Sequence, residues 1–174
     1  MYSQLVFQKM IFSYSYVMPI HFIKGDATNP IDYNDKREQI KLIVHICNDV
    51  NRFGKGFVAA LAKKWPQTKA SFHAMTNPML GDVDFCWIKD SELCVANMIA
   101  QHNIYCVYDK KTRQKIPPIR YEALRSCLKR VSDEVLTLTA YHPNTEITVH
   151  MPRIGCGLAG GKWELVEPIL KETV

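Results

Sequence analysis

The sequence contains no run of 18 apolar residues, no CxxC pair and no strong excess of one charge. Without a long apolar run, no segment is expected to span a membrane. The six cysteines lack the paired spacing of a zinc cluster or a disulfide framework, so we expect reduced thiols, no metal site and no cofactor. The formal net charge of +5 fits a polyanionic ligand but is too small to indicate a duplex nucleic-acid binder.

The N-terminal residues do not have the pattern of a signal peptide. The apolar stretch at residues 5–12 is interrupted by Gln8 and Lys9, with no basic region before it and no small-residue cleavage site after it. We therefore expect a cytoplasmic protein. The length of 174 residues suits one domain, which we place at residues 19–174. Residues 1–18 are then an N-terminal extension, either a tail or an added edge strand.

Glycine is scarce, at 8 of 174 residues, yet four of the eight lie within the seven residues 155–161. An apolar strand precedes this cluster and a helix start follows it. Glycine allows positive φ angles and close approach of the backbone to a ligand, because it has no Cβ. Successive N–H groups ahead of a helix make an anion site suited to phosphate. The simpler alternative is a tight strand-to-helix turn without a ligand.

Strand-like and helix-like segments alternate along the rest of the chain. Short apolar or β-branched runs predict strands, and apolar residues at alternating steps of 3 and 4 predict helices. We expect strands at residues 19–24, 41–47, 81–88, 93–99 and 146–151, and helices at 57–65, 117–138 and 163–174. Pro66 is expected to end the first helix, and residues 105–115 to form a mobile, charged loop. This order predicts an α/β fold, a three-layer α/β/α sandwich with a mixed, mostly parallel central sheet.

In such sheets, ligands bind at the carboxyl ends of the strands. A polar residue or a glycine-bearing loop follows four of the predicted strands: Asp26, residues 48–56, Gln101 and residues 153–161. We expect these features to gather at one edge of the sheet. Asp26 is expected either to cap the following segment or to accept a hydrogen bond from a ligand amine.

Three motifs, in this order, resemble the macrodomains, which bind ADP-ribose. They are Gly-Asp-Ala-Thr at residues 25–28, Val-His-Ile-Cys-Asn-Asp at 44–49 with Gly-Lys-Gly-Phe at 54–57, and Met-Pro-Arg-Ile-Gly-Cys-Gly-Leu at 151–158 followed by Trp-Glu. Within the family, the chain is similar to single-domain bacterial macrodomains grouped with terminal ADP-ribose protein glycohydrolase. The resemblance covers residues 19–174 and implies a bacterial protein. Family members usually have one more strand after the last helix, so either the domain lacks it or residues 5–16 supply a strand.

The resemblance implies a role for each matching residue. Asp26 and the Ala27 N–H would hold the adenine, the turn at residues 155–161 would wrap the diphosphate, and the loop at 48–57 would enclose the distal ribose. Met151 and Pro152 would form part of the apolar adenine pocket. The ligand-binding residues are then Asp26, Ala27, Asn48, Gly54, Gly56, Phe57, Met151, Pro152, Arg153, Ile154, Gly155, Cys156, Gly157, Leu158, Ala159 and Gly160.

The sequence departs from the human glycohydrolase of this group, which uses a lysine nucleophile and an aspartate in the diphosphate loop. Here the aspartate position reads Ala159, and the neighbourhood of the lysine reads Ala-Gln-His-Asn at residues 100–103. We therefore expect hydrolysis at C1″ of the distal ribose by a positioned water, through an oxocarbenium-like transition state. Gln101 is the candidate for orienting the water, and Asp49 or His102 for the base.

Each candidate also has a structural alternative: Gln101 as an ordinary hydrogen bonder, Asp49 as a loop cap and His102 as a surface residue. Cys156 is expected to fill space, since no partner histidine is identifiable.

The resemblance implies an ADP-ribosyl glycohydrolase that releases ADP-ribose from ester-linked acidic side chains of modified proteins, and from ADP-ribosylated nucleic acid. Two alternatives remain open. Loss of the lysine and aspartate pair favours a non-catalytic reader of terminal ADP-ribose. An ADP-ribose 1″-phosphate phosphatase would need a general acid or base within reach of the phosphate. We expect a monomer whose partner is ADP-ribose or an ADP-ribosylated protein.

Overall fold

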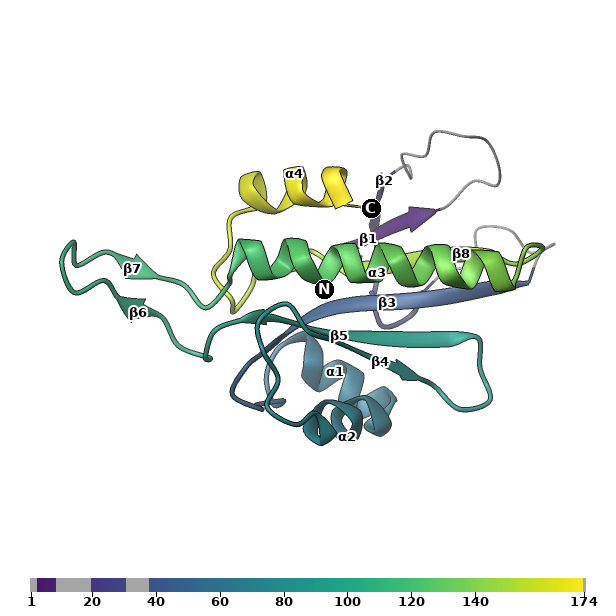
Figure 1. Cartoon of the computed structure of the whole chain (residues 1–174), viewed down its shortest axis with the longest axis horizontal. Coiled ribbons are helices and arrows are strands. Elements are labelled where there is room, and N and C mark those ends of the chain that lie inside the picture. Colours follow the sequence, from purple (N-terminus) through teal and green to yellow (C-terminus); the bar gives the residue numbers. More distant parts are fainter. Residues whose placement is uncertain (1–2, 9–19, 31–37, 174) are drawn as a thin grey trace.

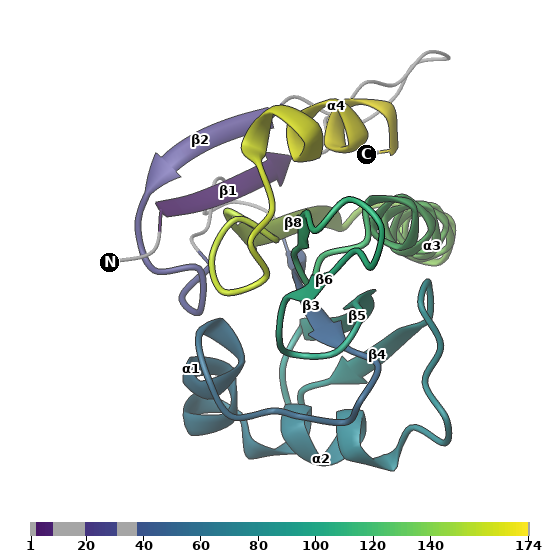
Figure 2. The same cartoon turned by 90° about the vertical axis from the view of Figure 1, so that its left-hand side faces the viewer.

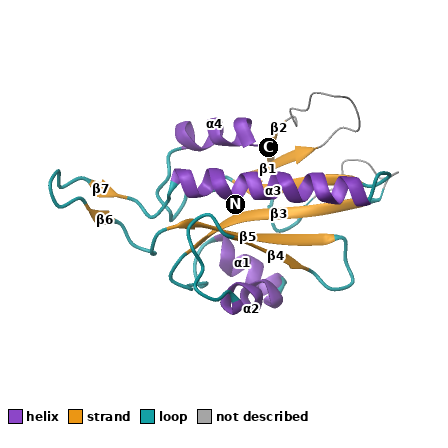
Figure 3. Ribbon diagram, in the orientation of Figure 1, coloured by secondary structure: helices purple, strands orange, loops and turns teal. Residues whose placement is uncertain are grey.

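The structure, a computed structural model, describes residues 3–8, 20–30 and 38–173. A six-stranded sheet with the strand order β2-β1-β8-β3-β5-β4 lies between two layers of helices (Figures 1 and 3). The elements are β1 Ser3–Gln8, β2 Ile20–Lys24, β3 Gln39–Asn48, α1 Phe57–Lys64, α2 Pro66–Ala74, β4 Val83–Trp87, β5 Leu93–Gln101, β6 Val107–Tyr108, β7 Lys115–Ile116, α3 Tyr121–Tyr141, β8 Glu146–Pro152 and α4 Trp163–Thr173.

The central sheet is mixed. β3 runs parallel to both of its neighbours, β5 and β8, whereas β4 runs antiparallel to β5 and β1 runs antiparallel to both β8 and β2. Four of the six strands, β2, β8, β3 and β5, therefore point the same way. The predicted three-layer α/β/α sandwich is confirmed, and β4 and β5 form an antiparallel hairpin.

Strand β1 comes from the N-terminal extension. It pairs with residues 20–24 of β2 on one side and with residues 148–152 of β8 on the other. The strand is thus internal, whereas the sequence suggested a strand at an edge. Both of its edges are used for hydrogen bonding, so β1 joins β2 to the rest of the sheet. Residues 9–16, the remainder of the segment for which a strand was considered, lie outside the described residues.

The core follows the two-residue period of the central strands. In β3, Ile40, Leu42 and Val44 pack in the cluster that contains α3 and α4, whereas Ile43 packs with Leu61 of α1. The apolar stripe predicted for the long helix is buried against this sheet face. Its buried residues are Ala123, Leu124, Cys127, Leu128, Val131, Val135 and Leu138. Among the described residues, no helix is long and apolar enough to cross a membrane.

One local expectation was incomplete and another was wrong. Helix α1 ends at Lys64, ahead of Pro66 as predicted, but Pro66 is also the first residue of α2, a helix that was not expected. Proline is tolerated in the first turn of a helix, where its missing N–H would have no intrahelical acceptor. Residues 105–115, expected to be a loop, instead contain most of a two-stranded hairpin, in which Val107 pairs with Ile116 and Tyr108 with Lys115.

A buried polar network lies between the sheet and helix α2. The ring of His45 is 2.6 Å from Asn97 Oδ1, and Asn97 Nδ2 donates to Asp84 Oδ2 at 2.8 Å and to the carbonyl of Thr68 at 3.2 Å. Ser71 donates to the other oxygen of Asp84. Burial lowers the pKa of His45 to about 4, although the hydrogen bond with Asn97 opposes the shift. His45 is therefore neutral in the folded protein at pH 7.

This burial predicts a loss of stability in acid. The unfolded chain takes up a proton on His45 near pH 6.5, whereas the folded protein does so only near pH 4. The free energy of unfolding should therefore fall by about 3 kcal/mol as the pH drops through this interval. Urea denaturation at pH values between 7.5 and 4 measures how the free energy of unfolding depends on pH. This dependence should be weaker in His45→Gln and unchanged in His142→Gln, an exposed control. An equal dependence in all three proteins would refute the assignment.

Candidate functional site

The loops with chemistry-bearing residues meet at one edge of the sheet. Because β2, β3, β5 and β8 point the same way, their carboxyl ends lie together, and Figure 2 looks onto this edge. The loops that follow these strands start at residues 25, 49, 102 and 153. The parallel direction of these strands thus brings together segments that are more than 120 residues apart in the chain.

Asp26, in the loop after β2, caps that loop. Its Oδ1 accepts hydrogen bonds from the N–H and the hydroxyl of Thr28, both at 2.9 Å. Lys64, at the end of α1, donates to the Thr28 carbonyl at 2.6 Å and so holds the loop against that helix. None of the described residues donates to Asp26 Oδ2, and the residue is exposed. Ala27 is completely buried. The capping role is present, and one carboxylate oxygen remains available to a ligand.

Asn48 shapes the loop after β3. Its Oδ1 accepts the N–H groups of Val50 and Arg52, and its Nδ2 donates to the Arg52 carbonyl at 2.7 Å. The amide is therefore occupied by its own loop. Further along, Gly56 has a φ of +75°, and a Cβ there would lie 3.2 Å from Leu158 Cδ1. The loop after β3 thus touches the glycine turn after β8.

Gly54 and Phe57 are two further predicted ligand residues in or next to the loop after β3. Gly54 faces open space, with no atom within 4 Å of a Cβ placed on it. Phe57, the first residue of α1, makes an edge-to-face contact with His45 at 5.8 Å between ring centres. Gly54 is thus free to face a ligand, whereas Phe57 also packs against the buried network.

The glycine turn leaves several backbone donors unused. Within the turn, the N–H of Gly160 donates to Gly157 and that of Gly161 to Gly155 at 2.7 Å. The N–H groups of Gly155, Gly157, Leu158 and Ala159 donate to none of the described residues. Gly155 has a φ of +73° and Gly160 one of +69°, which other residues rarely adopt. These four N–H groups are the donors that the predicted anion site would use.

The remaining predicted ligand residues are divided between the core and the surface. Met151 and Ile154 are buried in the core, and Pro152 is also buried. Arg153 is exposed, and its guanidinium lies 5.1 Å from the ring centre of Trp163. Burial raises the pKa of the Cys156 thiol, against the opposing charge of Arg153. A raised pKa makes Cys156 a poor nucleophile, in line with a space-filling role.

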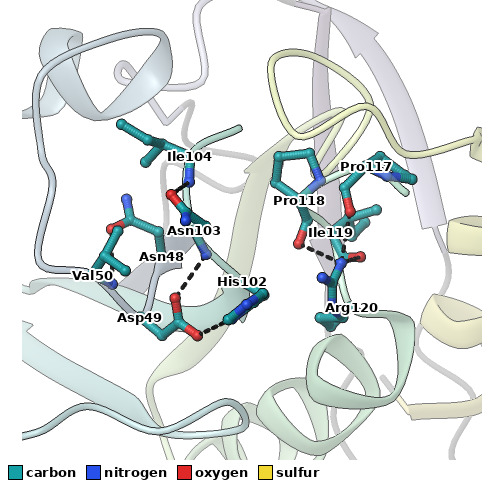
Figure 4. Close-up of polar contacts among 10 residues, drawn as sticks. All are labelled: Asn48, Asp49, Val50, His102, Asn103, Ile104, Pro117, Pro118, Ile119 and Arg120. Atoms are coloured by element: carbon teal, nitrogen blue, oxygen red, sulfur yellow. Dashed lines mark hydrogen bonds and ion pairs between the residues drawn. The ribbon is translucent and has the colours of Figure 1, made fainter. Parts of the chain in front are cut away.

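Asp49 and His102 form a hydrogen-bonded pair at the same edge (Figure 4). His102 Nδ1 lies 2.7 Å from Asp49 Oδ2, and the N–H of Asn103 donates to Asp49 Oδ1 at 2.8 Å. Partial burial would raise the pKa of Asp49, but the hydrogen bonds from Asn103 and His102 and the positive charge on His102 outweigh it and lower the pKa. The carboxylate is therefore ionised at neutral pH and accepts the Nδ1–H of His102. The His102 side chain is 50% exposed.

A segment that had no assigned role, residues 117–120, connects this pair to the glycine turn. The Pro118 carbonyl accepts the N–H of His102 at 2.8 Å, and the N–H of Ile119 donates to the Ala159 carbonyl at 3.2 Å. Arg120 Nη1 donates to the carbonyls of residues 117, 118 and 119, which Figure 4 shows converging on the guanidinium. A Cβ at Gly155 would lie only 2.4 Å from Ile119 Cδ1. Arg120 thus fixes the segment that supports both halves of the site.

Comparisons with known proteins give the family of the chain. A scan against models of protein families gives no match. A protein of unknown function from Bacteroides thetaiotaomicron is 48% identical, with a TM-score of 0.71, and the alignment covers 87% of this chain and 88% of that one. A macrodomain protein from Streptomyces coelicolor is 36% identical over 86% of this chain and 87% of that one, with a TM-score of 0.63. The chain belongs to the macrodomain family.

A further relative of this macrodomain carries a functional name. The ADP-ribose 1″-phosphate phosphatase of Candida albicans is 25% identical over 88% of this chain and 92% of its own length.

Gln101 is the third catalytic candidate of this macrodomain. Its carbonyl accepts the N–H of Asp49 at 3.0 Å, so the ends of β5 and β3 are joined there. Its side chain is half-buried and bonds to none of the described residues. A pocket of roughly 440 Å³ that the sequence had not indicated opens between the loops after β3 and β5. This pocket is lined by Val50, Arg52, Asn103, Ile104 and Tyr105.

Proposed function

We propose that this macrodomain binds ADP-ribose at the carboxyl edge of its sheet and releases it from acidic side chains of modified proteins. The observation that carries this proposal is the Asp49–His102 pair, held next to a glycine turn with unused N–H donors. ADP-ribose linked to nucleic acid is a second carrier of the same C1″ chemistry. The name of the Candida relative, which acts on a derivative of ADP-ribose, supports the choice of ligand.

The binding half of the proposal assigns each part of the ligand to a group of atoms. The N–H groups of Gly155, Gly157, Leu158 and Ala159 receive the diphosphate, because they are backbone donors without other acceptors among the described residues. Asp26 Oδ2 accepts the adenine amine. The distal ribose then extends toward Asp49 and His102.

The catalytic half assigns His102 as the base. With Nδ1–H donated to Asp49, the neutral imidazole carries its lone pair on Nε2, which can take a proton from water. The water oxygen forms a bond to C1″ as the bond between C1″ and the ester oxygen breaks, and the electron pair leaves on the carboxylate. Asp49 stabilises the imidazolium that results, and Gln101 orients the water. The Lys–Asp mechanism of the human relative is not needed.

A second candidate function is hydrolysis of ADP-ribose 1″-phosphate. The relative that bears this name favours it, and the Asp49–His102 pair offers the base that this reaction also requires. The two reactions differ in the atom that water attacks, C1″ for the ester and phosphorus for the phosphate. The products distinguish them, since the first frees ADP-ribose from a protein and the second releases inorganic phosphate.

The test is release of ADP-ribose from a protein modified on glutamate and aspartate. The parent should release it, and Gln101→Ala should lower kcat by about tenfold to a hundredfold, because the water loses its orientation. Calorimetric affinity for ADP-ribose should stay within about threefold of the parent, since Gln101 is not assigned to binding. Gln67→Ala, on α2 and outside the loops of the carboxyl edge, is the matched control.

Other results would change the assignment. Tight binding of ADP-ribose without any release would mean a reader rather than an enzyme. Release of phosphate from ADP-ribose 1″-phosphate without release from protein would mean a phosphatase. Absence of ADP-ribose binding would reject the whole proposal.

A further inference from the structure

A two-stranded arm, residues 104–116, extends from the carboxyl edge. It consists of β6, β7 and their flanking residues, and Figure 1 shows it projecting beyond the body of the domain. It carries two exposed aromatic side chains: Tyr105 is 71% exposed and Tyr108 is 66% exposed. Exposed aromatic rings offer a partner flat surfaces for stacking.

The arm is also strongly basic. It carries four cationic residues and one acidic residue, Asp109. The cations are Lys110, Lys111, Arg113 and Lys115, and none of them forms an ion pair with a described residue. The arm thus holds a net charge of +3, out of +5 for the whole chain.

The single carboxylate is used to build the tip. Asp109 Oδ1 accepts the N–H groups of Lys111 and Thr112 and the Thr112 hydroxyl, at 2.9, 2.6 and 2.9 Å. The N–H of Asp109 donates to the Gln114 carbonyl, and the N–H of Arg113 to the Asp109 carbonyl. The tip is therefore an ordered turn that holds the cations in a defined place, and Asp109 does not pair with any of them.

The two faces of the hairpin differ. Val107 lies opposite Ile116, and Tyr108 lies opposite Lys115. Because side chains alternate along a strand, the apolar pair occupies one face and the Tyr108–Lys115 pair the other. A tyrosine ring next to a lysine offers a stacking surface beside a phosphate-binding charge.

The base of the arm lies in the candidate site. Asn103, the residue before the arm, donates its N–H to Asp49, and Ile104 and Tyr105 line the 440 Å³ pocket together with Arg52. Arg52 and Tyr105 therefore lie at the pocket, at the base of the arm that carries Tyr108 and the cationic tip.

We propose that residues 104–116 form a binding arm for single-stranded nucleic acid. Bases stack on exposed aromatic rings whatever their identity, and cations along the same groove contact the backbone phosphates. An acidic peptide would use the cations but would leave the tyrosines without a stacking partner, so the combination favours a polynucleotide. Double-stranded DNA is a poorer fit, since its bases are already stacked. This binding needs neither ADP-ribose nor turnover, so it and the proposed function can fail separately.

The test is fluorescence anisotropy with an unmodified, labelled oligothymidine of about 20 nucleotides, over a range of salt concentrations. Three proteins are compared with the parent: Tyr105→Ala/Tyr108→Ala, Lys110→Ala/Lys111→Ala/Arg113→Ala, and the charge-matched control Lys63→Ala/Lys69→Ala/Lys129→Ala. We expect the tyrosine variant to bind about tenfold more weakly. The arm-cation variant should bind at least tenfold more weakly, and its salt dependence should be shallower by about two in log–log slope. The control should keep the slope of the parent.

The proposal is overturned if the parent does not bind the oligonucleotide, or if the control loses as much affinity as the arm-cation variant. It is also overturned if a labelled glutamate-rich peptide binds as tightly and the tyrosine variant behaves like the parent, because the arm would then recognise acidic protein. The thermal unfolding midpoint of each variant is measured as well. A midpoint equal to that of the parent shows that the substitutions leave the fold intact.

Discussion

Asp49→Asn is expected to slow release of ADP-ribose about a thousandfold, the range that general base catalysis contributes. Asparagine keeps the acceptor for the Asn103 N–H but presents an amide N–H to His102 Nδ1. His102 then carries its proton on Nε2 and can no longer take one from water. Single-turnover measurements with modified protein as substrate give the rate of the chemical step directly.

The Asp49–His102 pair also predicts how the rates of the single and double variants compare. If Asp49 acts through His102, then His102→Gln and the double variant should be as slow as Asp49→Asn, because groups that act as a unit are not additive. Affinity for ADP-ribose should change by less than about threefold in all three. Asp90→Asn, in the exposed turn between β4 and β5, is the control for a lost charge. If Asp49→Asn lowered the rate of ADP-ribose release by less than fivefold, the assigned base would be ruled out.

Gly157→Glu is expected to weaken binding of ADP-ribose at least a hundredfold without reducing the stability of the fold. Gly157 is exposed, lacks a positive φ angle, and has no atom within 4 Å of the place its Cβ would occupy. A glutamate therefore fits, but it brings a carboxylate to the donors proposed to hold the diphosphate. Like charges placed together in a binding site cost several kcal/mol. Isothermal titration calorimetry with ADP-ribose measures the loss.

The matched control for this variant is Gly157→Ala, which adds the Cβ without the charge. Its affinity should stay within about threefold of the parent, and both variants should unfold at the urea concentration of the parent. If Gly157→Ala bound ADP-ribose as weakly as Gly157→Glu, the loss of affinity would come from the added Cβ and not from the charge. If Gly157→Glu bound normally, the diphosphate would not lie at this turn.

Much of the fold was predictable because it depends on local patterns. The two buried faces of β3 and the buried stripe of α3 follow from the periods of strands and helices. The glycine turn was recognisable because four glycines in seven residues are rare outside a special backbone. The parallel direction of β2, β3, β5 and β8 then brought the four predicted loops to one edge.

Other features depend on context that a single segment does not contain. Pro66 starts α2, although a proline at that point is equally compatible with a helix end. The short β6–β7 hairpin has only two residues in each strand, too few for a period to show. Strand β1 is internal because β2 and β8 both have an edge for it, which its own residues do not reveal.

The site divides in the same way. The amino-acid sequence by itself determined which residues are candidates for the chemistry, since carboxylates, imidazoles and glycines are identifiable one at a time. Only the tertiary structure decided that Asp49 pairs with His102, 53 residues later, and that Arg120 supports the segment between that pair and the glycine turn. Distances between residues far apart in the chain are set by how strands and loops pack, and no local pattern records them.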